Sequence, residues 1–212
     1  MNRVLEKNPN TPQYWEKVYL EEVGTKKQRV DDARFGQLMR WMGFRSAEIG
    51  GKPSLLDAGC GLADVAQLAR DRGLLDRFSY TGLDLSAATL GMARLKLEAH
   101  PVVFQAGGVE KIPFPDEAFD IAWCGETLEH VDDPDSAVRE LGRVTKESGL
   151  VAISIPYRHR NTSPEHVWEF TPEDVFRWGV IVGEVQYLEC LLLPSYLTMF
   201  GVFRKAWRHI LS

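Results

Sequence analysis

The stretch that most constrains the fold of this 212-residue chain is an apolar strand that runs into a glycine-rich turn. Residues 55–63 read LLDAGCGLA, and a helical pattern follows over 62–73. Glycine lacks a Cβ atom, so Gly59 and Gly61 let the backbone turn sharply and approach a ligand closely. A strand, a glycine turn and a helix in this order place bare backbone N–H groups against a small-molecule cofactor.

Carboxylates around the turn indicate what kind of ligand it takes. A dinucleotide-binding turn reads G-x-G-x-x-G or -A, whereas Asp64 stands at the position of the third glycine. Together with Asp57 it would repel a pyrophosphate, while a ligand that carries an ammonium and a sulfonium suits the same turn. Asp84, at the end of the next apolar run, lies where a carboxylate accepts hydrogen bonds from ribose hydroxyls.

Four sequence blocks occur together and in order. They are LLDAGCGLA, YTGLDLS, AGGVEKIPFPDEAFDIAWCGETLEHVDDP and SGLVAISIP. In this order they resemble the S-adenosylmethionine (SAM) loop, the ribose-binding strand end, the adenine loop with the fourth strand, and the fifth strand of the class I SAM-dependent methyltransferases. The chain is most similar to the small-molecule type, which includes the ubiquinone-pathway O-methyltransferases.

This resemblance implies SAM as the cofactor and S-adenosyl-L-homocysteine (SAH) as its product. The cofactor-binding residues that it implies are Asp57, Ala58, Gly59, Cys60, Gly61, Asp84, Leu85, Gly108, Val109, Glu110 and Cys124. Two positions depart from the family pattern. Ala63 stands where the SAM loop usually has glycine, and Gly108 replaces the aspartate that accepts the adenine amino group. We expect cofactor binding to survive, with the backbone N–H of Val109 donating to the ring.

Alternating strand and helix patterns predict the fold. We expect a Rossmann-like, doubly wound α/β sheet of about seven strands, mostly parallel with an antiparallel C-terminal hairpin, preceded by two N-terminal helices. The parallel strands are expected at 52–57, 78–84, 102–105, 119–124 and 150–155, and the hairpin strands at 180–193 and 195–204. Ser86 and Pro134 are expected to begin helices that run to Ala99 and Lys146.

Length and composition narrow the class of protein further. We expect one domain, with an N-terminal helical cap over 1–50, a SAM-binding core over 51–156, and a substrate-side loop and hairpin over 157–212. The net charge of −5 argues against a nucleic-acid groove, and no apolar run approaches the ~20 residues of a membrane span. Three unpatterned cysteines and an N-terminus without the apolar core of a secretion signal predict a cytoplasmic protein. The resemblance implies a small-molecule substrate, and the sequence leaves open whether the protein is a monomer or a homodimer.

The segment after the fourth parallel strand carries candidate catalytic residues. Glu126, Glu129 and His130 are spaced i, i+3, i+4, so one helical turn would gather them on one side, and His166 follows the fifth strand. Ubiquinone-pathway O-methyltransferases and small-RNA 2′-O-methyltransferases have a related set that holds a divalent metal. That resemblance implies a metal on Glu126, Glu129, His130 and His166, which would lower the pKa of an acceptor hydroxyl.

A metal-free interpretation competes with this one and is favoured. In metal-free relatives similar Glu-His turns are structural, and a single histidine can act as the general base. We therefore expect His130, His166 and Glu126 to be catalytic in methyl transfer to a hydroxyl oxygen of a small molecule. The alternatives are a non-catalytic SAM-binding sensor or partner subunit, and a metal-dependent RNA 2′-O-methyltransferase.

Overall fold

The glycine turn follows β2 (Ser54–Ala58), an interior strand of the sheet. In the computed structural model, the residues described are 1–22, 32–157, 164–192 and 197–206. β2 lies between β3 (Ser79–Asp84) and β5 (Phe119–Gly125) and is parallel to both. Its last four residues are buried, which explains why these four are apolar apart from Asp57.

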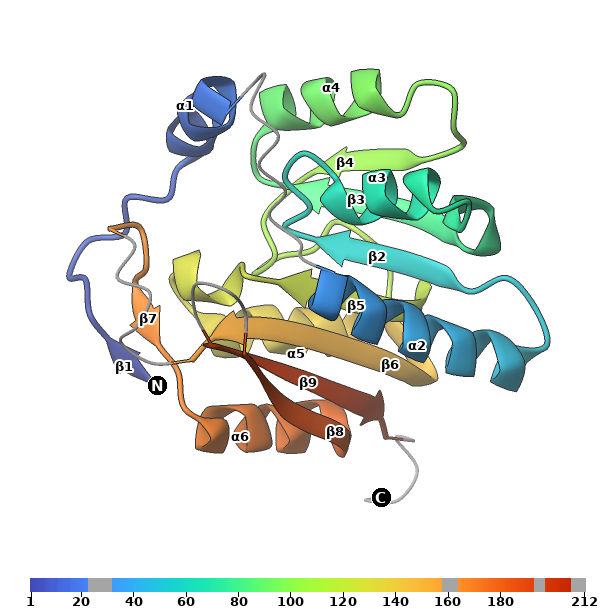
Figure 1. Cartoon of the computed structure of the whole chain (residues 1–212). Helices are drawn as coiled ribbons and strands as arrows, with labels where there is room; N and C mark the ends of the chain where they lie inside the picture. The colour runs from blue at the N-terminus through green and yellow to red at the C-terminus, as the bar shows by residue number, and fades with distance from the viewer. Residues whose placement is uncertain (23–31, 158–163, 193–196, 207–212) are drawn as a thin grey trace.

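Seven strands form one sheet in the order β4-β3-β2-β5-β6-β9-β8 (Figure 1). β4 (Val103–Ala106) and β6 (Thr145–Pro156) complete the parallel part, and β9 (Leu197–Lys205) and β8 (Gly183–Leu192) add an antiparallel hairpin. The predicted Rossmann-like sheet with an antiparallel C-terminal hairpin is therefore confirmed.

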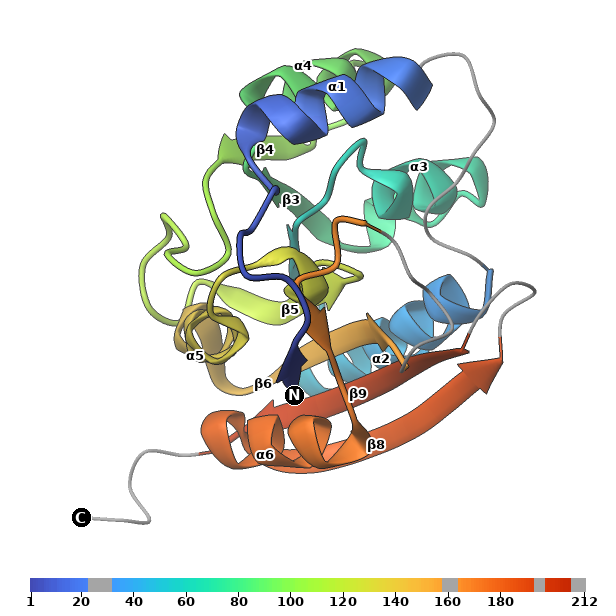
Figure 2. The same ribbon diagram turned by 90° about the vertical axis from the view of Figure 1, so that its left-hand side faces the viewer.

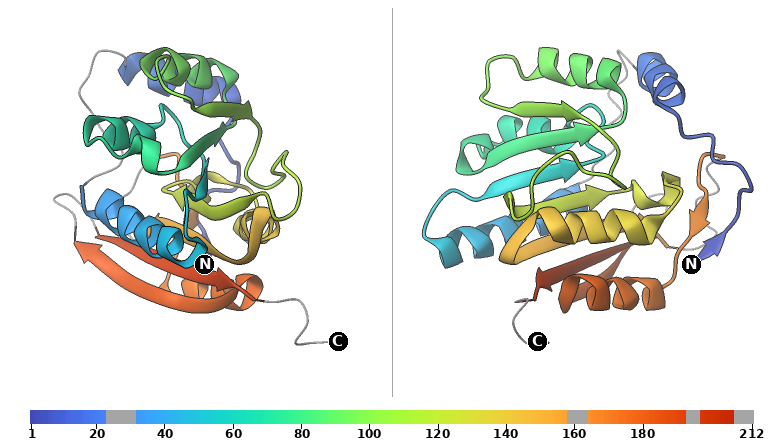
Figure 3. Two further views of the ribbon diagram at one scale, coloured as in Figure 1. Left: turned by 90° about the vertical axis from the view of Figure 1, so that its right-hand side faces the viewer. Right: turned by 180° about the vertical axis from the view of Figure 1, so that it is seen from behind.

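Helices cover both faces of this sheet (Figures 1 and 3). The helices are α1 (Pro12–Glu22), α2 (Asp32–Ile49), α3 (Asp64–Asp71), α4 (Ala87–Lys96), α5 (Pro134–Val144) and α6 (Pro172–Val182), with short 3₁₀ turns η1 (Leu75–Arg77) and η2 (Leu128–His130). Two apolar cores result. Residues of α2, α3 and α4 pack on one face of the sheet, and residues of α5 and α6 pack on the other.

Neighbouring strand residues alternate between the two cores. Leu55 lies in the α2–α4 core and Leu56 in the α5–α6 core, and Ile121 and Ala122 divide in the same way. All four side chains are fully buried. This alternation fixes the register of the strands, and with it the position of every strand end at the edge where the glycine turn lies.

Several element boundaries differ from the sequence-based prediction, and three of the differences have a structural reason or concern a predicted helix end. α4 begins after Ser86, whose hydroxyl accepts from the Thr89 N–H at 3.1 Å as expected, but it ends at Lys96. α5 ends at Val144 and not at Lys146, because β6 already begins at Thr145. Residues 180–182 belong to α6 and not to the hairpin, because helix packing overrides the strand propensity of Val-Ile-Val.

The N-terminal segment pairs with the loop after β6. β1 (Asn2–Arg3) forms an antiparallel pair with β7 (Trp168–Glu169), so residues 1–10 cross the carboxyl ends of the parallel strands (Figure 2). The sequence did not predict this second sheet.

Of the three cysteines, Cys60 and Cys124 are buried and unpaired, while the side chain of Cys190 is not among those described. No helix among the described residues has the length and apolarity that crossing a bilayer requires.

Two helix glycines provide a test of how closely α6 packs on the hairpin. A Cβ atom at Gly179 in α6 would collide with Val185 of β8, whereas one at Gly43 in α2 would meet nothing within 4 Å. We expect Gly179→Ala to lower the free energy of unfolding by about 1–3 kcal/mol through overpacking. Gly43→Ala should raise it by up to about 1 kcal/mol, because alanine is the better helix former.

Urea denaturation of both variants and of the wild type would measure these changes. Shifts of the same sign for the two variants would contradict the packing described for α6.

Candidate functional site

The end of β3 holds the glycine turn in place. The backbone N–H groups of Gly59 and Cys60 both donate to the carbonyl oxygen of Leu83, at 2.8 and 2.9 Å. The N–H of Gly61 donates to Oδ2 of Asp84 at 2.9 Å, while Oδ1 of this carboxylate accepts from the backbone that leads into α4. Three consecutive backbone donors of the turn are thus bound to two residues of the neighbouring strand.

The turn has a left-handed backbone at three positions. Gly59 and Gly61 have φ of 80° and 53°, and Ala63 has φ of 61° immediately before α3. Ala63 is the position at which the family pattern has glycine. A left-handed conformation strains a residue with a Cβ atom by roughly 1–2 kcal/mol, which is the physical reason for glycine there. Ala63 is fully buried, and its methyl group packs in the α2–α4 core.

Side chains from outside the sheet pack directly against the bare glycine backbone. A Cβ atom on Gly61 would collide with the phenol of Tyr19 in α1. A Cβ atom on Gly59 would collide with the side chain of Thr127, which follows β5. The turn is therefore covered by α1 on one side and by the segment that carries the candidate catalytic residues on the other.

Asp57 lies beneath the turn and is buried. Its Oδ2 accepts a hydrogen bond from the hydroxyl of Tyr80 at 2.6 Å. Burial raises the pKa of Asp57 to about 7, against the opposing effect of the Tyr80 hydrogen bond, and the charges of Asp64 and Asp84 add to the rise. A cation bound at the turn would favour the ionised form of this carboxyl group.

The predicted adenine loop lies beside the same strand ends. The N–H of Gly107 donates to the backbone carbonyl of Asp84 at 3.0 Å, and Val109 is buried. A Cβ atom on Gly108 would have only the half-exposed Leu85 side chain near it, at 3.8 Å. A Cβ atom at the place of the family's aspartate would therefore make only ordinary van der Waals contact.

Other predicted cofactor residues have defined surroundings too. Ala58 at the end of β2 and Cys124 in β5 are both fully buried, and burial raises the pKa of the Cys124 thiol. The carboxylate of Glu110 accepts from the backbone N–H of Asp133 at 2.7 Å, near the beginning of α5.

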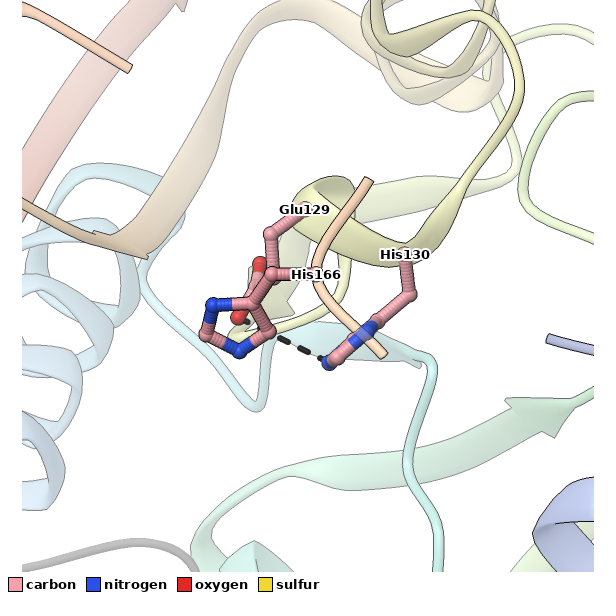
Figure 4. Close-up of side chains that lie close together, drawn as sticks. All are labelled: Glu129, His130 and His166. Carbon is pink, nitrogen blue, oxygen red and sulfur yellow. Dashed lines mark ion pairs between the residues drawn. The ribbon is translucent and has the colours of Figure 1, made fainter. Parts of the chain in front are cut away.

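Three of the predicted acceptor-side residues converge (Figure 4). Each of Glu129, His130 and His166 offers a ligand atom within 4.8 Å of the others, and the two imidazole rings are 5.0 Å apart between centroids. Glu129 is only 1% exposed, its Oε1 lies 3.8 Å from Nε2 of His130, and its Oε2 has no hydrogen-bond partner in the described part of the chain. Burial and the nearby charge of Glu126 raise the pKa of Glu129 well above its ordinary value, while Arg34 opposes the rise.

Glu126 does not join this group. The helical turn expected over 126–130 is not formed, because η2 begins only at Leu128 and Glu126 has a left-handed φ of 50°. Its Oε1 is 3.1 Å from Nη1 of the buried Arg34 in α2, and accepts from the hydroxyls of Ser154 at 3.2 Å and Thr198 at 2.9 Å. The carboxylate of Glu126 therefore ties α2 to β6 and β9.

Backbone contacts determine which nitrogen of His130 carries the proton. Nδ1 lies 3.1 Å from the carbonyl oxygen of Glu165, and a carbonyl can only accept, so Nδ1 is the donor. In the neutral imidazole Nε2 then keeps its lone pair, on the side of Glu129. The Trp15 ring of α1 packs edge-on against the imidazole at 4.9 Å.

Several residues of this region were not found from the sequence. These residues make contacts between segments distant in the chain, and no local motif marks them. The contacts are those of Tyr80 with Asp57, Tyr19 with Gly61 and Arg34 with Glu126. The charge of Arg34 next to the apolar residues of the buried face of α2 was the one usable signal.

Comparisons with known proteins agree with this geometry. A family model described as "Methyltransferase domain" matches residues 56–153. The chain is 35% identical over 115 residues to a malonyl-[acyl-carrier protein] O-methyltransferase of Serratia marcescens, covering 54% of this chain and 42% of that protein. It is 34% identical over 134 residues to a ubiquinone biosynthesis O-methyltransferase of Alkalilimnicola ehrlichii, covering 58% and 52%.

Among solved structures, the magnesium protoporphyrin IX methyltransferase of Synechocystis with bound SAH superimposes with a TM-score of 0.70. That match covers 92% of this chain and 98% of the other at 12% identity, so it shows the fold alone. The chain spans about half the length of the curated relatives it matches. The glycine turn and the strand order of this chain agree with the match to a methyltransferase domain over residues 56–153.

The buried Asp57 predicts how stability depends on pH. The folded state keeps the Asp57 proton up to a pKa of about 7, whereas the unfolded chain releases it near pH 4, so the folded state binds more protons between these values. The protonated Asp57 therefore contributes its full stabilisation of the folded state below about pH 4, and this contribution is lost as pH rises to about 7. We expect wild type to lose on the order of 4 kcal/mol over this window relative to Asp57→Asn.

Denaturation of both proteins at several pH values between 4 and 8 would measure the difference. A difference that is constant across this range would contradict the assignment of Asp57.

Proposed function

We propose that this protein transfers the methyl group of SAM to a hydroxyl oxygen of a small molecule. The observation that carries the proposal is the glycine turn, whose bare backbone is bound to Asp84 and lies over the buried Asp57 in a matched methyltransferase domain. Two carboxylates at this turn suit a cofactor with positive charge and oppose one with phosphates. The names of the curated relatives, which are O-methyltransferases, support oxygen as the acceptor atom.

The residues at the turn fit such a cofactor. Backbone N–H groups of Gly61 and Ser86 hold the Asp84 carboxylate at the turn, and a carboxylate in this place suits ribose hydroxyls as donors. Gly108 has no side chain beside Leu85, and in this proposal the adenine ring lies there with the Val109 backbone near it. In this proposal the remaining cofactor contacts come from Ala58, Gly59, Cys60, Gly61, Glu110 and Cys124.

Bound SAM supplies a methyl group that is already activated by its positive sulfur, so the protein has to align an acceptor and accept one proton. His130 is suited to accept the proton of a hydroxyl, because its Nδ1 is occupied by the Glu165 carbonyl and its Nε2 has a lone pair. His166 stands next to it and contributes to orienting the same hydroxyl. Glu126 contributes by holding α2 against the strand ends.

A divalent metal at Glu129, His130 and His166 is a second candidate feature of this site. The buried Oε2 of Glu129 without a hydrogen-bond partner favours it, because an unpaired buried carboxylate is costly and a bound cation would offset that cost. One carboxylate and two imidazoles suit zinc or manganese. Such an ion would lower the pKa of an acceptor hydroxyl and orient it. Glu126 would take part only by leaving Arg34.

The domain organisation and the setting of the protein are part of the proposal. We assign 1–50 to a helical cap, 51–156 to the SAM-binding core, and 157–212 to the substrate side. A net charge of −5 disfavours RNA as the acceptor, and we place the protein in the cytoplasm as a monomer or homodimer. A non-catalytic SAM-binding role is disfavoured by the converging histidines.

The cofactor assignment predicts the effect of changing Asp84. We expect calorimetric titration to show SAH binding to the wild type and a loss of roughly 30-fold or more in Asp84→Ala, because charge-assisted hydrogen bonds to the ribose and to the turn disappear. Asp76→Ala, an exposed aspartate in η1, is the matched control and should bind SAH as the wild type does. Absence of SAH binding to the wild type would refute the proposed function.

The metal assignment has its own test. We expect calorimetric titration with Zn²⁺ or Mn²⁺ to show one site in the wild type, and no site in Glu129→Gln or His130→Gln. Glu98→Gln is the control, because Glu98 is exposed and lies before β4, away from the site. Methyl transfer that persists after chelation, with no metal heat in the wild type, would leave His130 as a general base without a metal.

A further inference from the structure

Residues 1–10 bind the two segments that carry Glu129, His130 and His166. The N–H of Val4 donates to the carbonyl of Val167 at 2.8 Å, and the N–H of Val167 donates to the carbonyl of Glu129 at 2.7 Å. Val167, the residue after His166, is therefore bound by the N-terminal segment on one side and by η2 on the other. The antiparallel pairing of β1 with β7 extends this contact between the N-terminal segment and the loop by two residue pairs, Asn2 with Glu169 and Arg3 with Trp168.

Two asparagines of this segment bind the backbone of His130 and of Glu165, the residue before His166. Nδ2 of Asn8 donates to the carbonyl of His130 at 2.9 Å, and Nδ2 of Asn10 donates to the carbonyl of Glu165 at 2.8 Å. Oδ1 of Asn8 accepts from both the backbone N–H and the side-chain amide of Asn10, at 2.9 and 2.7 Å. The two amides thus form one unit that bridges His130 and Glu165.

The chemistry of the partners fixes the orientation of both amides. The carbonyls of His130 and Glu165 can only accept, so each asparagine must present its NH₂ group to them. The Glu165 carbonyl accepts two hydrogen bonds, one from Asn10 and one from Nδ1 of His130. Asn10 thereby orients the acceptor that determines the tautomer of His130.

We propose that Asn8 and Asn10 are positioning residues of the acceptor site, which hold His130 with a proton on Nδ1 and its Nε2 lone pair toward Glu129 and His166. This inference rests on the proposed function, in which Nε2 of His130 accepts a proton or binds a cation. Asn8 fixes the backbone of His130. Asn10 fixes the Glu165 carbonyl, to which the His130 ring donates. Neither asparagine contacts the reacting atoms.

A direct test observes the imidazole and not the activity. In protein labelled with ¹⁵N-histidine, long-range ¹H–¹⁵N spectra distinguish an Nδ1–H from an Nε2–H imidazole, and His130→Gln assigns the His130 signals. We expect a predominant Nδ1–H tautomer in the wild type and a mixture of tautomers in Asn10→Ala. Asn10→Asp, of nearly the same shape but without the donor, should shift the tautomer too and covers the case in which Asn10→Ala folds poorly.

Gln13→Ala is the matched control, since Gln13 is an exposed amide on the neighbouring α1. It should leave the His130 spectrum unchanged. In the asparagine variants we also expect turnover, and any Zn²⁺ affinity of the wild type, to fall about 10–100-fold, as is typical when a partner of a functional histidine is removed. SAH affinity and KM for SAM should stay the same, because Asn8 and Asn10 bind the backbone of His130 and Glu165 and not the proposed cofactor site at the glycine turn.

An unchanged His130 tautomer in both Asn10 variants would overturn the inference. So would a loss of activity that merely follows a fall in Tm and is matched by a loss of SAH affinity, since that pattern describes a structural clamp. Failure of the proposed function is distinguishable: wild-type protein would then not bind SAH, whatever the spectrum of His130 shows.

Discussion

The hydrogen bonds from the glycine turn to the end of β3 are the contacts on which the rest of the site depends. Buried backbone donors need partners, and here the Leu83 carbonyl and the Asp84 carboxylate satisfy three consecutive N–H groups. These bonds fix the path of the chain between β2 and α3, and bring Asp84 next to the turn. Because Asp84 also accepts from the backbone that leads into α4, one carboxylate aligns two helices with one strand edge.

The proposed site has a cofactor half and an acceptor half, and the two are built in different ways. The cofactor half uses the ends of adjacent parallel strands, so register alone brings its residues together. The acceptor half uses a 3₁₀ turn and a loop, and backbone contacts to residues 1–10 hold these together. In the proposed function, the acidic glycine turn binds the positively charged cofactor and the imidazole pair accepts the proton.

The sequence predicted the parallel strands, the glycine turn and the order of the elements, because apolar periodicity and glycine positions are local signals. It also predicted that Glu129, His130 and His166 would meet. It did not predict the Arg34–Glu126 pair or the Asn8–Asn10 unit, since these contacts join segments far apart in the chain. The spacing of Glu126 suggested a helix that its left-handed backbone rules out.

The pairing of the first residues with residues 165–169 has a consequence for how the molecule is made. During synthesis residues 1–10 leave the ribosome before the sheet does, yet their partners in β7 and the preceding loop emerge only after all of the parallel strands have been translated. Closing so long a loop is slow relative to local structure, so these contacts form late in folding. The nascent chain can therefore complete its cofactor half before its acceptor half exists, which makes assembly of the two imidazoles a late folding event.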